Sequence, residues 1–289
     1  MKRWIAALLI GAMVLCGSGC KEETKEEQKP KEMNLTVMTQ NVRLDSQPGE
    51  VDVLYRSEAL VELIEKYQPD IIGLQEFTPL WEFMMEDYIA ESRYEIELEY
   101  RCGWAPEATA ILYNAERLEL LKTEHFWLSD TPKEESVSWD DTLPRICTRC
   151  DFKDKKTGVV FSHVNTHLGL TYTSQTKSGE QLNAYIKKEL KGRPVFLTGD
   201  MNCTVGSDGY NNIIANNLLM DTSLFADEWG ETTGTFNGFT GQPGSKVIDF
   251  IFATPEKINA SYYSVLLDQP KDIIISDHYA VLAKCIVKN

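Results

Sequence analysis

Polar residues capable of chemistry recur at the ends of short apolar runs in this 289-residue sequence. Each run is typical of a buried strand. One carboxylate at a strand end is usually a turn or capping residue, but six such positions together predict a polar ring on one rim of the sheets. The positions are Asn41 after LTVMTQ, Glu76 after DIIGLQ, His167 after VVFSHVNT, Asp200 after VFLTG, Asp249 within KVIDFIF, and Asp277-His278 before YAVLA.

A ring of this composition suits metal-assisted hydrolysis. Carboxylate and amide oxygens favour a hard cation, Mg²⁺ first and Mn²⁺ as a substitute. Such an ion would bind a phosphate oxygen and offset the charge that develops on the leaving group. A histidine beside a carboxylate can activate water, and donor side chains can stabilise the pentavalent transition state. The ring therefore favours hydrolysis of a phosphoester.

The elements that must position this ring alternate along the chain. Apolar periodicity predicts helices over residues 57–67, 79–89 and 179–190, and a polar loop over 129–144. Strands are predicted over 35–40, 70–74, 108–113, 117–127, 145–152, 159–167, 195–198, 247–253, 261–267 and 279–287. Many strands lie too close together for helical crossovers, which favours antiparallel pairing. We expect one α/β domain of the α+β type, a four-layer sandwich of two packed mixed or antiparallel sheets flanked by helices.

The N-terminus has the layout of an export signal. A basic start, an apolar run and small residues precede Cys20, which is typical of a bacterial lipoprotein signal. The alternative is a plain secretory signal cut nearby, which would leave Cys20 unmodified. We expect a signal over 1–19, a charged tether over 20–33 and one catalytic domain over 34–289. The lipid on Cys20 would hold the protein outside the cytoplasm at the bacterial membrane surface.

The net charge and the cysteine count limit which substrates and partners we expect. The formal net charge is −15, and loss of Lys2 and Arg3 with the signal makes it −17. Strong negative charge repels polyanions, so nucleic acid is an alternative substrate and not the favoured one, although a local basic groove could exist. Five cysteines remain after residue 20, which is not a disulfide framework. Cys147 and Cys150 should face opposite sides of one strand, which suits neither a metal clip nor a local disulfide. A monomer is expected.

Six motifs in order resemble the endonuclease/exonuclease/phosphatase superfamily, the deoxyribonuclease-I-like fold. The resemblance runs from about Leu35 to the C-terminus. Any one motif is weak, but the ordered set is specific. The motifs are TQN at 39–41, GLQE at 73–76, NTHL at 165–168, TGDMN at 198–202, IDFIF at 248–252 and SDH at 276–278.

The resemblance implies a role for each motif residue. Glu76 would be the principal Mg²⁺ ligand, with Asn41 beside it and Asp277 close to the metal. Asp200 would position or polarise the attacking water. The remaining roles are phosphate-oxygen contacts from Asn202 and His167, and a catalytic base or charge stabiliser at His278 held by Asp249.

Other segments resemble a bacterial branch of the superfamily. They are FWLSDTP at 126–132, SWDD at 138–141 and LPRICT at 143–148. Arg145 in the last of these could clamp a phosphate, and the alternative is an exposed arginine at a strand start. The segment 169–179 departs from the branch because it carries no arginine, which puts substrate contacts from this turn in doubt.

Two hypotheses follow. The first is a phosphodiesterase or phosphomonoesterase acting on nucleic acid, phospholipid or inositol-phosphate headgroups, or sugar phosphates. The second is a non-catalytic surface binding protein of the same fold. Every motif position is present, which favours the enzyme. Among the other candidates, His163 is expected to be a core histidine, while Trp104 and Trp139 could stack on a substrate or simply anchor their loops.

Overall fold

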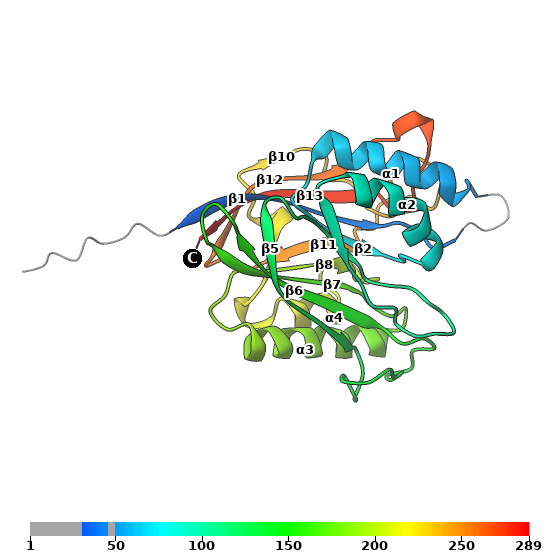
Figure 1. The fold of residues 1–289 in the computed structure, drawn as a ribbon. Helices are drawn as coiled ribbons and strands as arrows, with labels where there is room; N and C mark the ends of the chain where they lie inside the picture. Colours follow the sequence, from blue (N-terminus) through cyan, green and yellow to red (C-terminus); the bar gives the residue numbers. More distant parts are fainter. Residues whose placement is uncertain (1–30, 46–49, 289) are drawn as a thin grey trace, which may run out of the picture.

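The described part of the chain folds as two β-sheets packed face to face with helices on both outer faces. The computed structural model describes residues 31–45 and 50–288. Figure 1 shows the two sheets between two layers of helices. One apolar cluster fills the space between the sheets, and a second and a third lie beneath the two helical layers. The predicted four-layer sandwich is therefore confirmed. The predicted signal, Cys20 and most of the tether lie outside the described residues.

The first sheet has seven strands within the described residues. In chain order they are β1 (Glu32–Asn41), β2 (Ile71–Gln75), β3 (Tyr94–Glu97), β4 (Ile111–Asn114), β10 (Glu228–Trp229), β12 (Ile258–Leu266) and β13 (Ala280–Lys288). They lie side by side in the order β10-β12-β13-β1-β2-β4-β3. Helices α1 (Val53–Tyr67) and α2 (Pro79–Glu91) cover the outer face (Figure 1).

The second sheet has six strands in the same part of the chain. They are β5 (Leu118–Trp127), β6 (Ile146–Asp154), β7 (Val160–His167), β8 (Val195–Asp200), β9 (Met220–Asp221) and β11 (Asp249–Ala253), in the order β5-β6-β7-β8-β11-β9. Helices α3 (Tyr172–Glu189) and α4 (Asp208–Ile213) cover it. Short 3₁₀ turns span Ala215–Asn217, Thr222–Leu224 and Pro270–Asp272.

Each sheet contains one parallel strand pair joined by a helix. In the first sheet α1 connects β1 to β2, and Asn41 lies in register with Gln75. In the second, α3 connects β7 to β8, and His167 lies in register with Asp200. Parallel strands end at the same edge of a sheet. The carboxyl ends of four strands therefore meet at one rim, where the sequence predicted polar groups.

Helix boundaries follow capping residues. The side chains of Asp52, Thr78 and Thr171 accept hydrogen bonds from the first turns of α1, α2 and α3. Helix α3 starts seven residues before the predicted Gly179, because its first two turns bury small polar residues and show no apolar periodicity. No helix in the described ranges is both long and apolar enough to cross a membrane.

The start of the domain was predicted slightly late. Strand β1 begins at Glu32, two residues before the expected Asn34. Glu32 and Met33 pair with Lys288 and Val287 of β13, and Met33 is buried. The last two residues assigned to the tether therefore belong to the sheet, because β13 extends far enough to pair with them.

The cysteines behave as predicted. Cys147 packs into the cluster beneath α3, whereas Cys150 lies between the two sheets. All five cysteines in the described residues are buried and unpaired. Burial raises the pKa of both thiols above its ordinary value, so neither is suited to hold a metal as a thiolate.

Gly73 on β2 lies where side chains of the second sheet come close to the first. A Cβ atom there would lie 2.3 Å from Thr198 Oγ1 and 2.5 Å from Asn165 Oδ1. Gly73→Ala should therefore lower the free energy of unfolding by about 1–3 kcal/mol through overpacking, measured by urea denaturation. Gly103→Ala is the matched control, since nothing lies within 4 Å of its added methyl. Equal stability of the two variants would contradict this account.

Candidate active site

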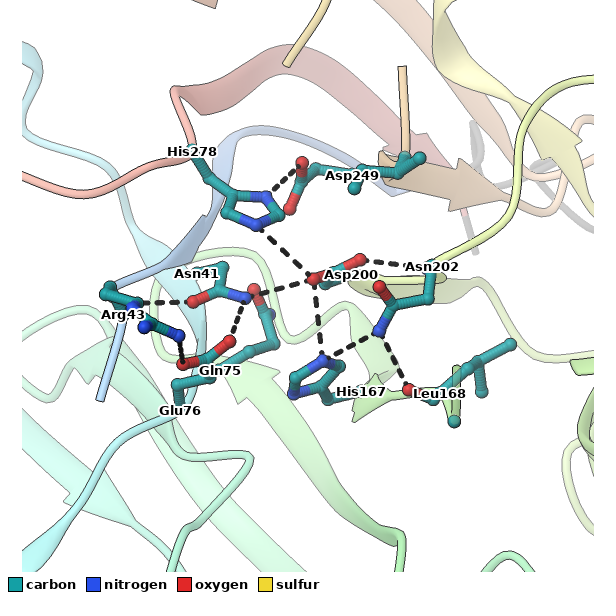
Figure 2. Close-up of polar contacts among 12 residues, drawn as sticks. Asn41, Arg43, Gln75, Glu76, His167, Leu168, Asp200, Asn202, Asp249 and His278 are labelled. Atoms are coloured by element: carbon teal, nitrogen blue, oxygen red, sulfur yellow. Dashed lines mark hydrogen bonds and ion pairs between the residues drawn. The ribbon is translucent and has the colours of Figure 1, made fainter. Parts of the chain in front are cut away.

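The carboxylate of Asp200, at the end of β8, is the centre of the predicted ring. It is 1% exposed and accepts hydrogen bonds from Asn41 Nδ2 at 3.0 Å and from the Asn202 backbone N–H at 2.8 Å. Two imidazoles face the same oxygen, His167 Nε2 at 3.5 Å and His278 Nε2 at 3.7 Å. Figure 2 shows these contacts converging on Asp200. The structure thus brings together side chains from β1, β7, β8 and the segment before β13.

Asn41 links Asp200 to Glu76. Its amide nitrogen donates to Glu76 Oε1 at 2.9 Å, and its oxygen accepts the Arg43 backbone N–H at 2.8 Å. Glu76 also accepts the Leu44 backbone N–H at 2.9 Å, and the Arg43 guanidinium lies 3.8 Å away. In this arrangement Asn41 holds Glu76 and donates hydrogen bonds. The predicted direct contact between a metal and its amide oxygen would require the amide to turn over.

His167 is oriented by contacts on both ring nitrogens. Asn202 Nδ2 lies 2.9 Å from Nε2 and also donates to the Leu168 carbonyl, which fixes its direction. His167 Nε2 is therefore an acceptor, and Nδ1–H donates to Glu107 Oε1 at 3.1 Å. The predicted partners Asn202 and His167 thus lie together, and they form one side of the ring.

His278 forms the opposite side of the ring. Its Nδ1 lies 2.9 Å from Asp249 Oδ2. Burial by itself lowers the pKa of His278, but the carboxylates of Asp249 and Asp200 outweigh it and raise the pKa to about 10. His278 is therefore an imidazolium at neutral pH. That state suits charge stabilisation better than proton abstraction. The role of His278 stays a prediction.

Two residues of the ring adopt left-handed backbone conformations. Glu76 has φ +58° and Asn202 has φ +48°. Glu76 directly follows β2, and Asn202 lies two residues after the end of β8, so each turns the chain at the rim. Such conformations cost about 1–3 kcal/mol for residues that disfavour them and cluster at functional sites.

Glu76 and Asp277 are the donors best suited to a divalent cation. Burial raises the pKa of Asp277, and the nearby Glu76 carboxylate adds to the rise. Two neighbouring carboxylates repel each other, and a cation between them would remove that cost. Their hard oxygen atoms match the preference of Mg²⁺. The residues present therefore fit the predicted metal site.

A second group of potential metal ligands lies beside the first. Asp200, Asp249 and His278 offer atoms within 4.8 Å of one another. Because Nδ1 of His278 is already hydrogen-bonded to Asp249, this ring would face a cation through Nε2.

Arg145 lies outside the ring of contacts. Its side chain is buried, and within the described residues its contact is an ion pair from Nε to Asp141 at 3.5 Å. It is not the exposed arginine of the alternative interpretation. Its charge helps hold the pKa of Glu107 below the ordinary value, together with a hydrogen bond from His167, against the opposing effect of burial. Its predicted phosphate contact stays a prediction.

The sequence reasoning missed Glu107, Arg101 and Arg43. Glu107 binds both His167 and the Arg101 guanidinium, the latter at 2.9 Å. The loop that carries both residues closes through the Arg101 N–H and the Glu107 carbonyl at 2.9 Å. No apolar run precedes Glu107, so no signal at strand ends marks it. Arg43 could have been found, because it follows the TQN motif by two residues.

A family model described as the Endonuclease/Exonuclease/phosphatase family matches residues 38–278. The chain belongs to the endonuclease/exonuclease/phosphatase family. The match spans the whole ring, from the strand that carries Asn41 to His278. The resemblance read from six motifs is thereby confirmed, together with the two-sheet fold that the family shares.

Two solved structures of this family resemble the chain over most of its length. One is an endonuclease/exonuclease/phosphatase family protein from Bacteroides thetaiotaomicron, with 26% identity and a TM-score of 0.82, covering 90% of this chain and 97% of that one. The other is a mannosyl-6-phosphatase from Bacteroides thetaiotaomicron VPI-5482. Its identity is 27% and its TM-score 0.79, over 87% of this chain and 99% of that one.

A relative outside bacteria is also similar. An uncharacterized protein of Acanthamoeba polyphaga mimivirus is 32% identical over 195 residues. The match covers 63% of this chain and 66% of that protein. Family and solved relatives together support hydrolase activity.

Glu107→Gln tests the pair that orients His167. The substitution keeps an acceptor near Nδ1 but removes the charge, so kcat should fall about tenfold, less than the 10²–10⁴-fold of a lost general acid or base. Steady-state kinetics on a phosphoester substrate measure it. Glu99→Gln, a nearby change outside the ring, is the control. A kcat equal to that of Glu99→Gln would remove Glu107 from the site.

Proposed function

We propose that the protein is a Mg²⁺-dependent hydrolase of a small phosphoester, anchored outside the cytoplasm through a lipid on Cys20. One observation carries the catalytic part of this proposal. The Asp200 carboxylate contacts Asn41, His167 and His278 at once, and Asn41 in turn holds Glu76. An arrangement that joins oxygen donors for a hard cation to two imidazoles supports phosphoester hydrolysis.

The metal would be held by Glu76 and Asp277. When bound, it would supply Lewis-acid stabilisation of charge on a phosphate oxygen. Asn41 keeps the Glu76 carboxylate in place through its 2.9 Å hydrogen bond. The Leu44 backbone N–H holds the other Glu76 oxygen, so the carboxylate is fixed at both ends.

The chain's own residues handle the water and the leaving group. Water attacks phosphorus, the bond from phosphorus to the leaving oxygen breaks, and one proton passes in net from the water to the leaving group. Asp200 accepts the hydrogen bond that orients the water. The imidazolium of His278 donates to a phosphoryl oxygen, and Asp249 keeps His278 charged. Asn202 Nδ2 donates to another phosphoryl oxygen when it releases its hydrogen bond to His167 Nε2.

A small substrate is favoured over a nucleic acid. The net charge of −15 for the whole chain repels polyanions. The mannosyl-6-phosphatase at 27% identity makes sugar phosphates the first class to test. Arg145 is proposed as an additional phosphate contact, reached when the substrate draws its guanidinium away from Asp141.

A substrate panel with metal controls tests the proposal. The fragment from Lys31 onward should hydrolyse one class among hexose phosphates, phosphoinositides, sphingomyelin, aryl phosphates, DNA and RNA. Activity should require Mg²⁺ or Mn²⁺ and vanish with EDTA. His278→Ala and Asp200→Ala should each lower kcat by at least about 10²-fold, because both remove groups that act in the transition state.

His125→Ala is the matched control for the histidine variant. His125 lies on β5, and its hydrogen-bond contact is with Thr148. Its replacement should leave kcat unchanged. Activity that survives chelation would overturn the metal mechanism. Silence across the panel, with no effect of Mg²⁺ on the melting temperature, would favour a binding protein.

The lipid anchor has its own test. The small-residue run that ends at Cys20 supports acylation there, and the anchor does not affect the chemistry. Cys20→Ala should move the protein from the membrane fraction to the soluble extracytoplasmic fraction and abolish labelling with radioactive palmitate. Cys102→Ala, which changes a buried cysteine of the domain, is the control. Membrane association that persists in Cys20→Ala would exclude the lipid.

A further inference from the structure

A layer of buried polar side chains lies between the two sheets directly beneath the active site. We name it the inter-sheet bridge. All its members are fully buried. They are Thr39 on β1, Gln75 on β2, His163 and Asn165 on β7, and Thr198 on β8.

Asn165 is the centre of this bridge. Its amide nitrogen donates to two backbone carbonyls of the first sheet side, Leu74 and Ala110, each at 2.8 Å. Its amide oxygen accepts from Gln75 Nε2 at 2.7 Å and from Thr198 Oγ1 at 3.0 Å. Four hydrogen bonds therefore tie β7 to β2, to the residue before β4 and to β8. The amide's hydrogen-bonding capacity is used fully, which a buried amide needs.

Thr39 and His163 complete the bridge. Gln75 Nε2 also lies 3.0 Å from Thr39 Oγ1. His163 Nε2 lies 2.8 Å from Thr198 Oγ1. Since the Thr198 hydroxyl donates to Asn165, it accepts from His163 Nε2–H, which fixes that ring as a neutral donor. Burial accordingly lowers the pKa of His163 to about 3.

Along three strands the bridge lies directly beneath the catalytic ring. Residues two apart on a strand share a face. Three members precede a ring residue by two positions, and Gln75 directly precedes Glu76. The pairs are Thr39 and Asn41 on β1, Asn165 and His167 on β7, and Thr198 and Asp200 on β8.

The two halves of the ring belong to different sheets. Asn41 and Glu76 extend from the first sheet, whereas His167 and Asp200 extend from the second. The bond from Asn41 Nδ2 to Asp200 Oδ2 joins them at the rim. Apolar packing between sheets tolerates small shifts, but hydrogen bonds of fixed direction do not. The bridge is thus placed to set the separation of the two halves.

We propose that Asn165 is a positioning residue that holds the metal-binding half and the water-activating half of the site in register. The proposal rests on the proposed function for its kinetic readout. It does not require Asn165 to contact substrate or metal. Stability is read separately from catalysis, because loss of the amide leaves its buried partners without a hydrogen bond and should lower the melting temperature in any case.

Asn165→Leu and Thr198→Val test the proposal. Asn165→Leu keeps the branched shape of the side chain, with a larger volume, and removes four hydrogen bonds. Its kcat should fall about 10²-fold with KM little changed, as expected for a displacement of about 1 Å. Its Kd for Mg²⁺ alone, measured by titration calorimetry, should weaken about tenfold, as is typical of groups that support metal ligands. Thr198→Val removes two of the bridge's hydrogen bonds, those with Asn165 and His163, and should shift both quantities in the same direction by less.

Thr148→Val is the matched control. Thr148 is also fully buried between the sheets, lies in register with Asn165 on β6, and contacts Thr109 Oγ1 at 3.4 Å. It has no contact with the ring in the described structure. Its loss should change the melting temperature without changing kcat or the Mg²⁺ Kd. If Thr148→Val shifted kcat and the Mg²⁺ Kd as much as Asn165→Leu does, the bridge would have no role beyond ordinary packing.

Three further outcomes decide the remaining cases. Wild-type kcat and Mg²⁺ Kd in a folded Asn165→Leu overturn the proposal. If Asn165→Leu does not fold, Thr198→Val decides in the same way. Should the wild type bind Mg²⁺ but hydrolyse nothing, the proposed function fails, and the Mg²⁺ Kd of the variants still tests the positioning role.

Discussion

The carboxylate of Asp200 carries a negative charge into a region almost closed to water. Burying such a charge costs several kcal/mol unless donors surround it. Donors on one chain segment cannot surround an atom, so they must come from several strands. Asn41, Asn202 and the imidazolium of His278 supply them from different parts of the fold. The strand ends converge on one rim, and this convergence places the donors around the buried Asp200 carboxylate.

The charges of Asp200 and Asp249 also set the protonation state of His278. His278 lies between Asp249 and Asp200, and its pKa rises to about 10 as a result. His167 is held differently, because Asn202 occupies one ring nitrogen and Glu107 the other. The two imidazoles, both within 4 Å of one carboxylate oxygen, therefore carry different numbers of protons. That difference suits them to different roles.

Much of the site could be predicted from the sequence because its residues follow apolar runs. A strand ends where polarity begins, and parallel strands joined by a helix end at one edge. Glu107 could not be found this way, since it lies in an irregular loop and its contact with His167 depends on the path of that loop. The orientation of the Asn41 amide was also beyond reach. It is set by the Arg43 backbone N–H, which no residue pattern reveals.

The fold shows the same division. Helices with an apolar stripe were predicted, whereas the first turns of α3 were missed because they bury serines instead of apolar residues. The polar residues within the strands gave no sign of their partners. Asn165 and Thr198 bind groups of another strand or another sheet, and sequence distance does not record that neighbourhood.

The length of strand β1 determines how far the start of the domain lies from the site. It runs ten residues from Glu32, where the described domain begins, to Asn41 in the site. At about 3.3 Å per residue the two ends lie about 30 Å apart. A group that holds the chain upstream of Glu32 therefore acts at the end of β1 that lies far from the site. In a domain fixed to a surface through that end, the site would lie at the far end of β1 from the point of attachment.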